Sequence, residues 1–178
     1  MIVKNIQTPL ELIKALKAVD SEFGYFEVLQ RMDVSDAEFE KYYTWNDQKY
    51  TRNCLARTEE FELMLICWEE DQASRIHDYG DGMAWVHPIS GCLKEERYLL
   101  SNNGTGLIKI SSLTLEGGEF SFVNKTGIHQ YQNNYETRAV SLHLYVKPLQ
   151  KRKIYDCSEG MCKTWSEEIV DDSVCVVV

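Results

Sequence analysis

The stretch AVSLHLYV, residues 139–146, alternates between apolar and polar side chains from Val140 onward. The apolar set is Val140, Leu142 and Leu144, and the polar set is Ser141, His143 and Tyr145. Successive side chains of a β-strand point to opposite faces, so the alternation predicts a strand with one apolar and one polar face. The polar row either meets solvent or lines a barrel as a hydrogen-bonded relay that orients the phenol of Tyr145 toward a ligand.

Several other short segments after Tyr50 have the composition of strands, and most are bounded by Gly, Asn or Asp. They are EFELMLICWEE (60–70), MAWVHP (83–88), CLKEERYLL (92–100), GLIKISSLTL (106–115) and EFSFVN (119–124). Many short strands at regular spacing are typical of a β-barrel or a β-sandwich.

The first part of the chain carries helix-start signals instead. Thr8, Pro9 and Glu11 form a capping box with proline in the first turn, and Ser35 with Glu38 repeats the pattern. Helices followed by strands predict an all-β body with a helical N-terminal cover. We expect a single domain over 1–178, with a helical part over about 1–45, a barrel over about 46–156 and a tail over 157–178.

Charge and hydropathy exclude two classes of partner. The net charge is −9, and the single short basic run, KRK at 151–153, is interpreted as a solvated face or a strand edge, so no nucleic acid is expected. No apolar run approaches the roughly 18 residues that span a membrane. The start of the chain also lacks a sustained apolar signal region.

The six cysteines match no zinc pattern: Cys54, Cys67, Cys92, Cys157, Cys162 and Cys175. Without an export signal we expect free thiols and a cytoplasmic protein. The last four residues, CVVV, have the outline of a prenylation box, but the final Val and the acidic residues before them favour an apolar tail.

Two segments resemble the motifs of the cupin superfamily. TGIHQYQNN (126–134) resembles the second motif, which ends in His-x-x-x-Asn, met here by His129 and Asn133. RIHDYGDGMAWVHPISG (75–91) resembles the first, which has His-x-His, an acidic position and a closing Gly. The residues at those positions are His77, Tyr79, Ala84 and Gly91.

Within the cupins, the chain resembles the cysteine dioxygenases over roughly residues 25–150. Five landmarks occur in order: YTRN (50–53), CW (67–68), IHD (76–78), GIH (127–129) and AVSLHLY (139–145). The resemblance implies a small jelly-roll barrel. It also implies oxidation of L-cysteine by O₂ to cysteine sulfinic acid at mononuclear non-haem Fe(II).

The resemblance implies a role for each matching residue. Two metal-binding histidines correspond to His77 and His129, and Tyr79 stands where the third would be. The substrate carboxylate would be bound by Arg52 beside Tyr50, and the active-site phenol would be Tyr145, held by Ser141 and His143. Some members carry a cysteine crosslinked to this phenol, and Ala84 at that position excludes the crosslink here.

Tyr79 leaves the third metal ligand open. A Tyr79 phenolate would favour Fe(III) or copper. Water could fill the position, or His87 could reach it if a bulge reversed the strand alternation. A protein without its metal is the alternative function: a cupin that binds a small thiol or carboxylate through Arg52 and Tyr145 without dioxygenase activity. A small barrel can be monomeric, and we expect a monomer.

Overall fold

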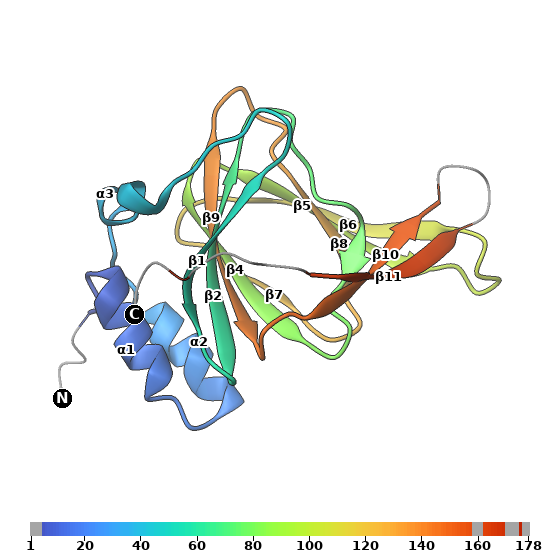
Figure 1. Ribbon diagram of the computed structural model, residues 1–178. Coiled ribbons are helices and arrows are strands. Elements are labelled where there is room, and N and C mark those ends of the chain that lie inside the picture. The colour runs from blue at the N-terminus through green and yellow to red at the C-terminus, as the bar shows by residue number, and fades with distance from the viewer. Residues whose placement is uncertain (1–4, 158–161, 170–174, 176–178) are drawn as a thin grey trace.

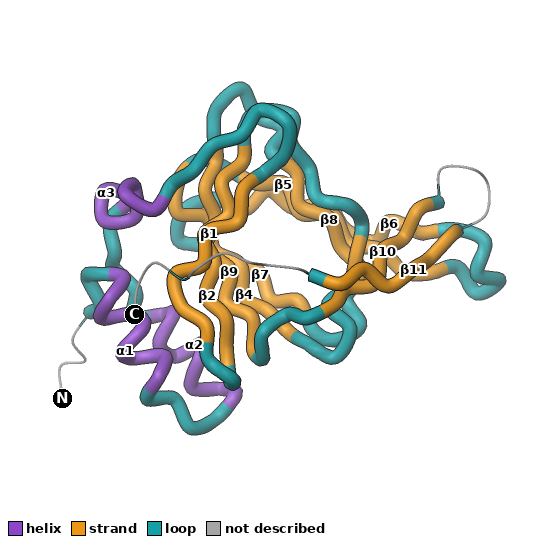
Figure 2. The backbone as a smooth tube through the Cα atoms, viewed as in Figure 1, coloured by secondary structure: helices purple, strands orange, loops and turns teal. Residues whose placement is uncertain are grey.

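The computed structural model describes residues 5–157, 162–169 and 175, and it consists of two antiparallel sheets preceded by short helices (Figures 1 and 2). The first sheet runs β1 (Thr51–Arg57), β2 (Phe61–Trp68), β9 (Ala139–Val146), β4 (Met83–Ser90), β7 (Ser121–Val123). The second runs β11 (Lys163–Glu168), β10 (Lys151–Asp156), β3 (His77–Asp78), β8 (Ile128–Gln132), β5 (Leu93–Leu100), β6 (Leu107–Leu115). The expected all-β body is confirmed.

The helices are α1 (Pro9–Lys17), α2 (Glu22–Gln30), the short α3 (Asp36–Phe39) and a 3-10 turn (Glu40–Tyr42). The hydroxyl of Thr8 accepts a hydrogen bond from the backbone N–H of Glu11 at 3.2 Å, as the capping signal predicts. Ser35 precedes α3 but makes no side-chain cap. Figure 1 shows α1 and α2 beside the first sheet. None of the described helices is long and apolar enough to cross a membrane.

The central strand β9 resolves the choice that its sequence left open. Its apolar side chains pack with those of α1 and α2 in one buried cluster, on the helix-covered face of the sheet. The opposite row therefore faces the second sheet, where Ser141, His143 and Tyr145 are each at most 3% exposed. Buried polar groups are costly without hydrogen-bond partners, so this row requires an internal network.

The second sheet brings two distant histidines together. β3 and β8 pair with His77 directly opposite His129, and β10 pairs on the other side of β3 with Ile154 opposite His77. β10 pairs with β11, which places Arg152 opposite Glu167. Residues 163–168, expected to belong to a tail over 157–178, form β11 and extend the sheet.

The expectation of free thiols is wrong for four of the six cysteines. Disulfides join Cys54 to Cys175 and Cys157 to Cys162, and only Cys67 and Cys92 are free. The first pair is separated by 121 residues, so it is created by the tertiary fold and leaves no spacing signal. Residues 176–178 of the CVVV segment lie outside the described residues. Cytoplasmic localisation, which was inferred partly from free thiols, stays a prediction.

Candidate active site

His77 and His129 form a facing pair inside the barrel, with ring centroids 4.3 Å apart. The Nδ1 of each ring bonds the carbonyl oxygen two residues earlier, on Arg75 at 2.7 Å and on Gly127 at 2.8 Å. A carbonyl only accepts, so each Nδ1 carries the proton and each Nε2 presents a lone pair. The Nε2 of His129 is buried without a hydrogen-bond partner among the described residues. Metal-binding imidazoles are commonly oriented in this way.

Burial keeps both rings neutral. Desolvation lowers the pKa of His129 to about 4, against the smaller raising effect of the Gly127 carbonyl. Desolvation also lowers the pKa of His77 well below its usual value, and the proximity of His129 adds to the effect. Neutral imidazole is the form that binds Fe, Cu and Zn. The pair therefore fits a transition metal.

Tyr79 lies beside this pair and is 2% exposed. Its ring centroid is 4.5 Å from that of His129 and 5.3 Å from those of His77 and Tyr145. Burial, with a smaller contribution from Tyr145, raises its pKa well above the usual value for a phenol. No group of three His, Cys, Asp or Glu side chains placed for a metal occurs in the described part of the chain. The donor set is thus two imidazoles beside a neutral phenol.

His87 lies on the other face of its strand. Its Nδ1 donates to the Glu119 carbonyl oxygen at 2.7 Å, and its ring stacks on Phe120 at 4.4 Å between centroids. β4 keeps strict alternation between Ala84 and His87, with an irregularity only after Pro88. The bulge that His87 would need in order to reach the metal position is absent there, so the structure places this ring away from the pair.

A chain of four buried side chains ends at Tyr145. Trp68 Nε1 donates to Ser141 Oγ at 3.0 Å, and Ser141 Oγ lies 2.8 Å from His143 Nε2. The third contact joins His143 Nδ1 to the Tyr145 hydroxyl at 3.3 Å. Burial, reinforced by Arg52, lowers the pKa of His143 well below its usual value, so the ring is neutral.

The first member of this relay has a fixed direction. Indole N–H is a donor only, so Ser141 accepts from Trp68 and keeps its own proton available for His143 Nε2, an arrangement that satisfies all three contacts. Neutral His143 then carries its proton on Nδ1 and donates to the oxygen of Tyr145. The hydroxyl proton of Tyr145 is left to point toward whatever occupies the cavity.

Arg52 faces the same interior from β1. Its guanidinium carbon lies 5.7 Å from the ring centroid of Tyr145, and its Nη2 lies 3.8 Å from the Glu62 carboxylate. Arg57 lies closer to Glu62, at 2.6 Å. Tyr50 packs on Trp68 with ring centroids 4.5 Å apart. A guanidinium in this position can bind the carboxylate of a ligand that lies next to Tyr145.

A small cavity of about 10 Å³ connects these groups. The described residues that line it are Tyr50, Arg52, Ile66, Trp68, Ser74, His77, Tyr79, Tyr131, His143, Tyr145 and Arg152. Sequence reasoning missed Arg152, because it lies in the KRK run that was interpreted as a solvated face. Tyr131 also lines the cavity, and it lies two residues after His129, on the same face of β8.

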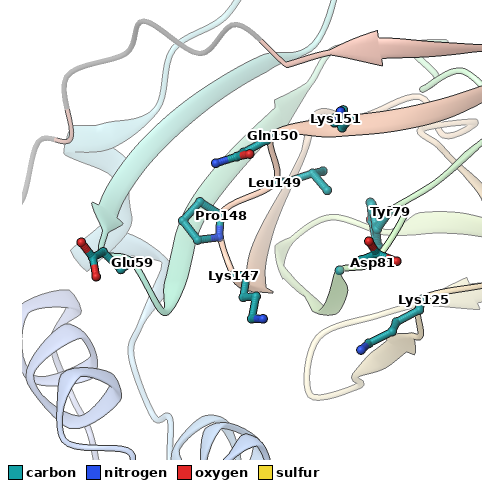
Figure 3. Close-up of a pocket in the computed structure, with 11 residues that line it drawn as sticks. Glu59, Tyr79, Asp81, Lys125, Lys147, Pro148, Leu149, Gln150 and Lys151 are labelled. Atoms are coloured by element: carbon teal, nitrogen blue, oxygen red, sulfur yellow. The ribbon is translucent and has the colours of Figure 1, made fainter.

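Tyr79 also borders a second, larger pocket of about 470 Å³, shown in Figure 3. Lys125, Lys147 and Lys151 line this outer pocket together with Glu59 and Asp81. The phenol of Tyr79 therefore lies at the boundary between the buried site and an open surface pocket. Substitution of Tyr79 by a smaller residue would bring the two spaces closer together.

Solved structures of low sequence identity show the same fold. One is an uncharacterized conserved protein with a double-stranded β-helix domain from Klebsiella pneumoniae, with TM-score 0.52, 12% identity, and coverage of 73% of this chain and 88% of that chain. Another is a sugar phosphate isomerase from the cupin superfamily from Silicibacter pomeroyi, with TM-score 0.50, 14% identity, and coverage of 71% and 80%. The predicted cupin fold is confirmed.

Sequence comparison identifies the family. The chain is 32% identical over 137 residues to cysteine dioxygenase type 1 of Rattus norvegicus, covering 75% of this chain and 68% of that protein. It is 30% identical over 168 residues to cysteine dioxygenase type 1 of Danio rerio, covering 89% and 84%. The family model for cysteine dioxygenase type I matches residues 3–158. The chain belongs to the cysteine dioxygenase type I family.

Proposed function

We propose that the protein is a thiol dioxygenase that oxidises a small thiol carboxylate, with L-cysteine as the reference substrate, to the sulfinic acid. The reaction is RSH + O₂ → RSO₂H, in which both oxygen atoms bind to sulfur and the sulfur is oxidised. The observation that carries the proposal is the His77–His129 pair, in which His77 lines the same cavity as Arg52 and Tyr145 and the Nε2 of His129 is buried without a hydrogen-bond partner among the described residues.

The metal would be iron, as Fe(II), held by His77 and His129 with Tyr79 alongside. When bound, it would supply a binding site for the substrate thiolate and the activation of O₂. Fe(III) or copper is the alternative if the Tyr79 phenol deprotonates on the metal. The fit rests on the Nε2 lone pairs of both rings, which remain available because each Nδ1 bonds a backbone carbonyl. It rests also on the Nε2 of His129, which is buried without a hydrogen-bond partner among the described residues.

The remaining residues bind and orient the substrate. Arg52 would bind the carboxylate through charge-assisted hydrogen bonds. The relay that begins at Trp68 holds the Tyr145 proton toward the cavity, where it can donate to an atom that gains negative charge. Tyr50, packed on Trp68, limits the space beside Arg52.

A second function competes with this one because Tyr79 replaces an imidazole by a neutral phenol. On that alternative the protein binds a small thiol or carboxylate through Arg52 and Tyr145, holds little metal and has no dioxygenase activity. Carboxylate binding by Arg52 and the hydrogen bonds that lead to Tyr145 do not depend on a metal. A protein without metal would therefore still bind the ligand.

Metal loading distinguishes the two functions. Purified protein is incubated anaerobically with Fe(II), desalted, and analysed for metal content, oxygen uptake with L-cysteine and sulfinate formation. Near-stoichiometric iron with oxygen uptake matched by sulfinate supports the dioxygenase. Protein that stays free of iron but binds L-cysteine in calorimetry supports the binding function. Light scattering on the same sample tests the prediction of a monomer.

A further inference from the structure

A second guanidinium group, that of Arg152, lines the cavity from the opposite sheet. Arg52 comes from β1 in the first sheet, and Arg152 comes from β10 in the second. The Arg152 side chain is 16% exposed, and its Nη1 lies 3.5 Å from the Tyr50 hydroxyl. The two cationic side chains therefore contribute to the wall of one small cavity, with Tyr50 next to both.

The contacts of Arg152 leave one edge of its guanidinium directed inward. Its Nε donates to Glu167 Oε2 at 2.7 Å, and its Nη2 lies 2.5 Å from the same atom. Both groups belong to the edge that faces β11. Nη1 is on the other side, toward Tyr50 and the cavity. An anion could bind Nη1 without breaking the ion pair with Glu167.

Glu167 does not fully neutralise the positive charge that Arg152 brings to the cavity wall. Arg75 Nη1 also bonds the Glu167 carboxylate, at 2.8 Å, so one negative charge is shared by two guanidinium groups. Arg75 is 60% exposed at its side chain and is absent from the cavity wall. Solvent screens its charge more than it screens that of Arg152.

The wall offers cations but no carboxylate. Among the described residues that line the cavity, two are arginines and none is Asp or Glu. Glu62 lies near Arg52 but is already paired with Arg52 and Arg57, so a protonated α-amino group of L-cysteine would find no unpaired carboxylate in this wall and would lie near like charges. A second carboxylate in the same place would lie near the guanidinium of Arg152, whose Nη1 can donate a hydrogen bond to it.

We propose that Arg152 is a specificity-determining residue that binds a second anionic group of the substrate, so that the site prefers thiols with two carboxylates to L-cysteine. Arg52 binds one carboxylate and Arg152 binds the other. The identity of the reaction rests on the proposed function, but the preference for a dianion does not require metal or oxygen.

Thiol-free probes test the preference directly. The purified protein is titrated by calorimetry with succinate, propionate and L-alanine at low ionic strength. Succinate is expected to bind at least about tenfold more tightly than propionate, equivalent to one charge-assisted contact. L-Alanine, which adds an ammonium group to propionate, is expected to bind more weakly than propionate.

Three variants locate the effect. Arg152→Gln is expected to reduce the ratio of succinate to propionate affinity to within about twofold of unity, with propionate affinity changed less than about threefold. Arg75→Gln loses a contact to the same Glu167 but lies outside the cavity wall, and it is expected to keep the preference. Arg152→Lys, which keeps the charge, should retain part of it. Circular dichroism establishes that each variant is folded.

The outcomes separate this inference from the proposed function. Equal binding of succinate and propionate, or a preference that survives Arg152→Gln in folded protein, overturns the inference. Oxygen uptake by iron-loaded protein is then measured with mercaptosuccinate, 3-mercaptopropionate and L-cysteine. If succinate is preferred but no thiol supports oxygen uptake, the dioxygenase proposal fails and the inference stands. If L-cysteine is oxidised at least as well as mercaptosuccinate, the dioxygenase stands and the inference fails.

Discussion

The indole nitrogen of Trp68 donates to Ser141 Oγ at 3.0 Å, and this contact joins residues that are 73 positions apart. Because indole N–H can only donate, the contact occupies one acceptor site of Ser141 and favours the arrangement in which Ser141 donates to His143 and His143 donates to Tyr145. Trp68 is thus a positioning residue that acts on the phenol through two intermediates.

Replacement of Trp68 by Phe should weaken this control. Ser141 could then accept from His143 Nε2–H, and the opposite tautomer would turn the Tyr145 proton toward the ring. Loss of one neutral hydrogen bond is worth about 1 kcal/mol, so kcat should fall about fivefold while KM changes little. Steady-state kinetics and the ¹⁵N shifts of His143 report the two effects. Trp165→Phe, at an exposed position on β11, is the control. An unchanged tautomer in Trp68→Phe would disprove the directional argument.

The third position of the metal site is tested by two substitutions of Tyr79. Tyr79→His completes a set of three imidazoles and is expected to raise iron affinity roughly tenfold or more, about 1.4 kcal/mol. Tyr79→Phe keeps the ring and removes the hydroxyl. Iron affinity, measured by competition with a chelator, should change little in Tyr79→Phe if water completes the site. A loss as large as that in His129→Ala would instead identify the phenol as a ligand.

Local patterns predicted those parts of the fold that depend on neighbouring residues. The alternation at 139–146 gave the strand β9, and Thr8 with Glu11 gave the start of α1. The alternation could not say which face was inside, because that depends on the apolar side chains that α1 and α2 supply.

The remaining features depend on long-range register. Arg152 reaches the cavity because β10 pairs with β3, and its neighbours Lys151 and Lys153 are exposed, so the basic run looked uniformly solvated. The disulfide joins Cys54 to Cys175 across 121 positions, a separation that no local pattern indicates. The resemblance to a family identified His77 and His129, which no local pattern would have paired.

His87 provides a matched control for the metal site. His129→Ala should abolish stable iron binding, because it removes one of two imidazole donors. His87→Ala should leave iron content unchanged and lower the free energy of unfolding by about 1 kcal/mol, from loss of the bond to Glu119 and the stacking on Phe120. Elemental analysis and denaturant titration measure the two quantities. Iron loss in His87→Ala would mean that this ring does reach the metal.

The two disulfides should differ in their effect on stability. The Cys54–Cys175 bond joins residues 121 positions apart, whereas Cys157–Cys162 spans 5. Closing the longer loop restricts the unfolded chain more, and the chain-entropy model gives a difference of about 3 kcal/mol. The double variant Cys54→Ala/Cys175→Ala should therefore lose about that much more unfolding free energy than Cys157→Ala/Cys162→Ala.

Denaturant titration of both double variants and the parent protein measures this difference, and repeating it with excess dithiothreitol supplies the control. Under reduction, the stability advantage of the parent over Cys157→Ala/Cys162→Ala should disappear. Its advantage over Cys54→Ala/Cys175→Ala should shrink to a small packing contribution from the cluster that Cys54 joins with Met64 and Tyr145. Equal midpoints for the two double variants under oxidising conditions would show that the long-range bond does not constrain the unfolded chain as its separation requires.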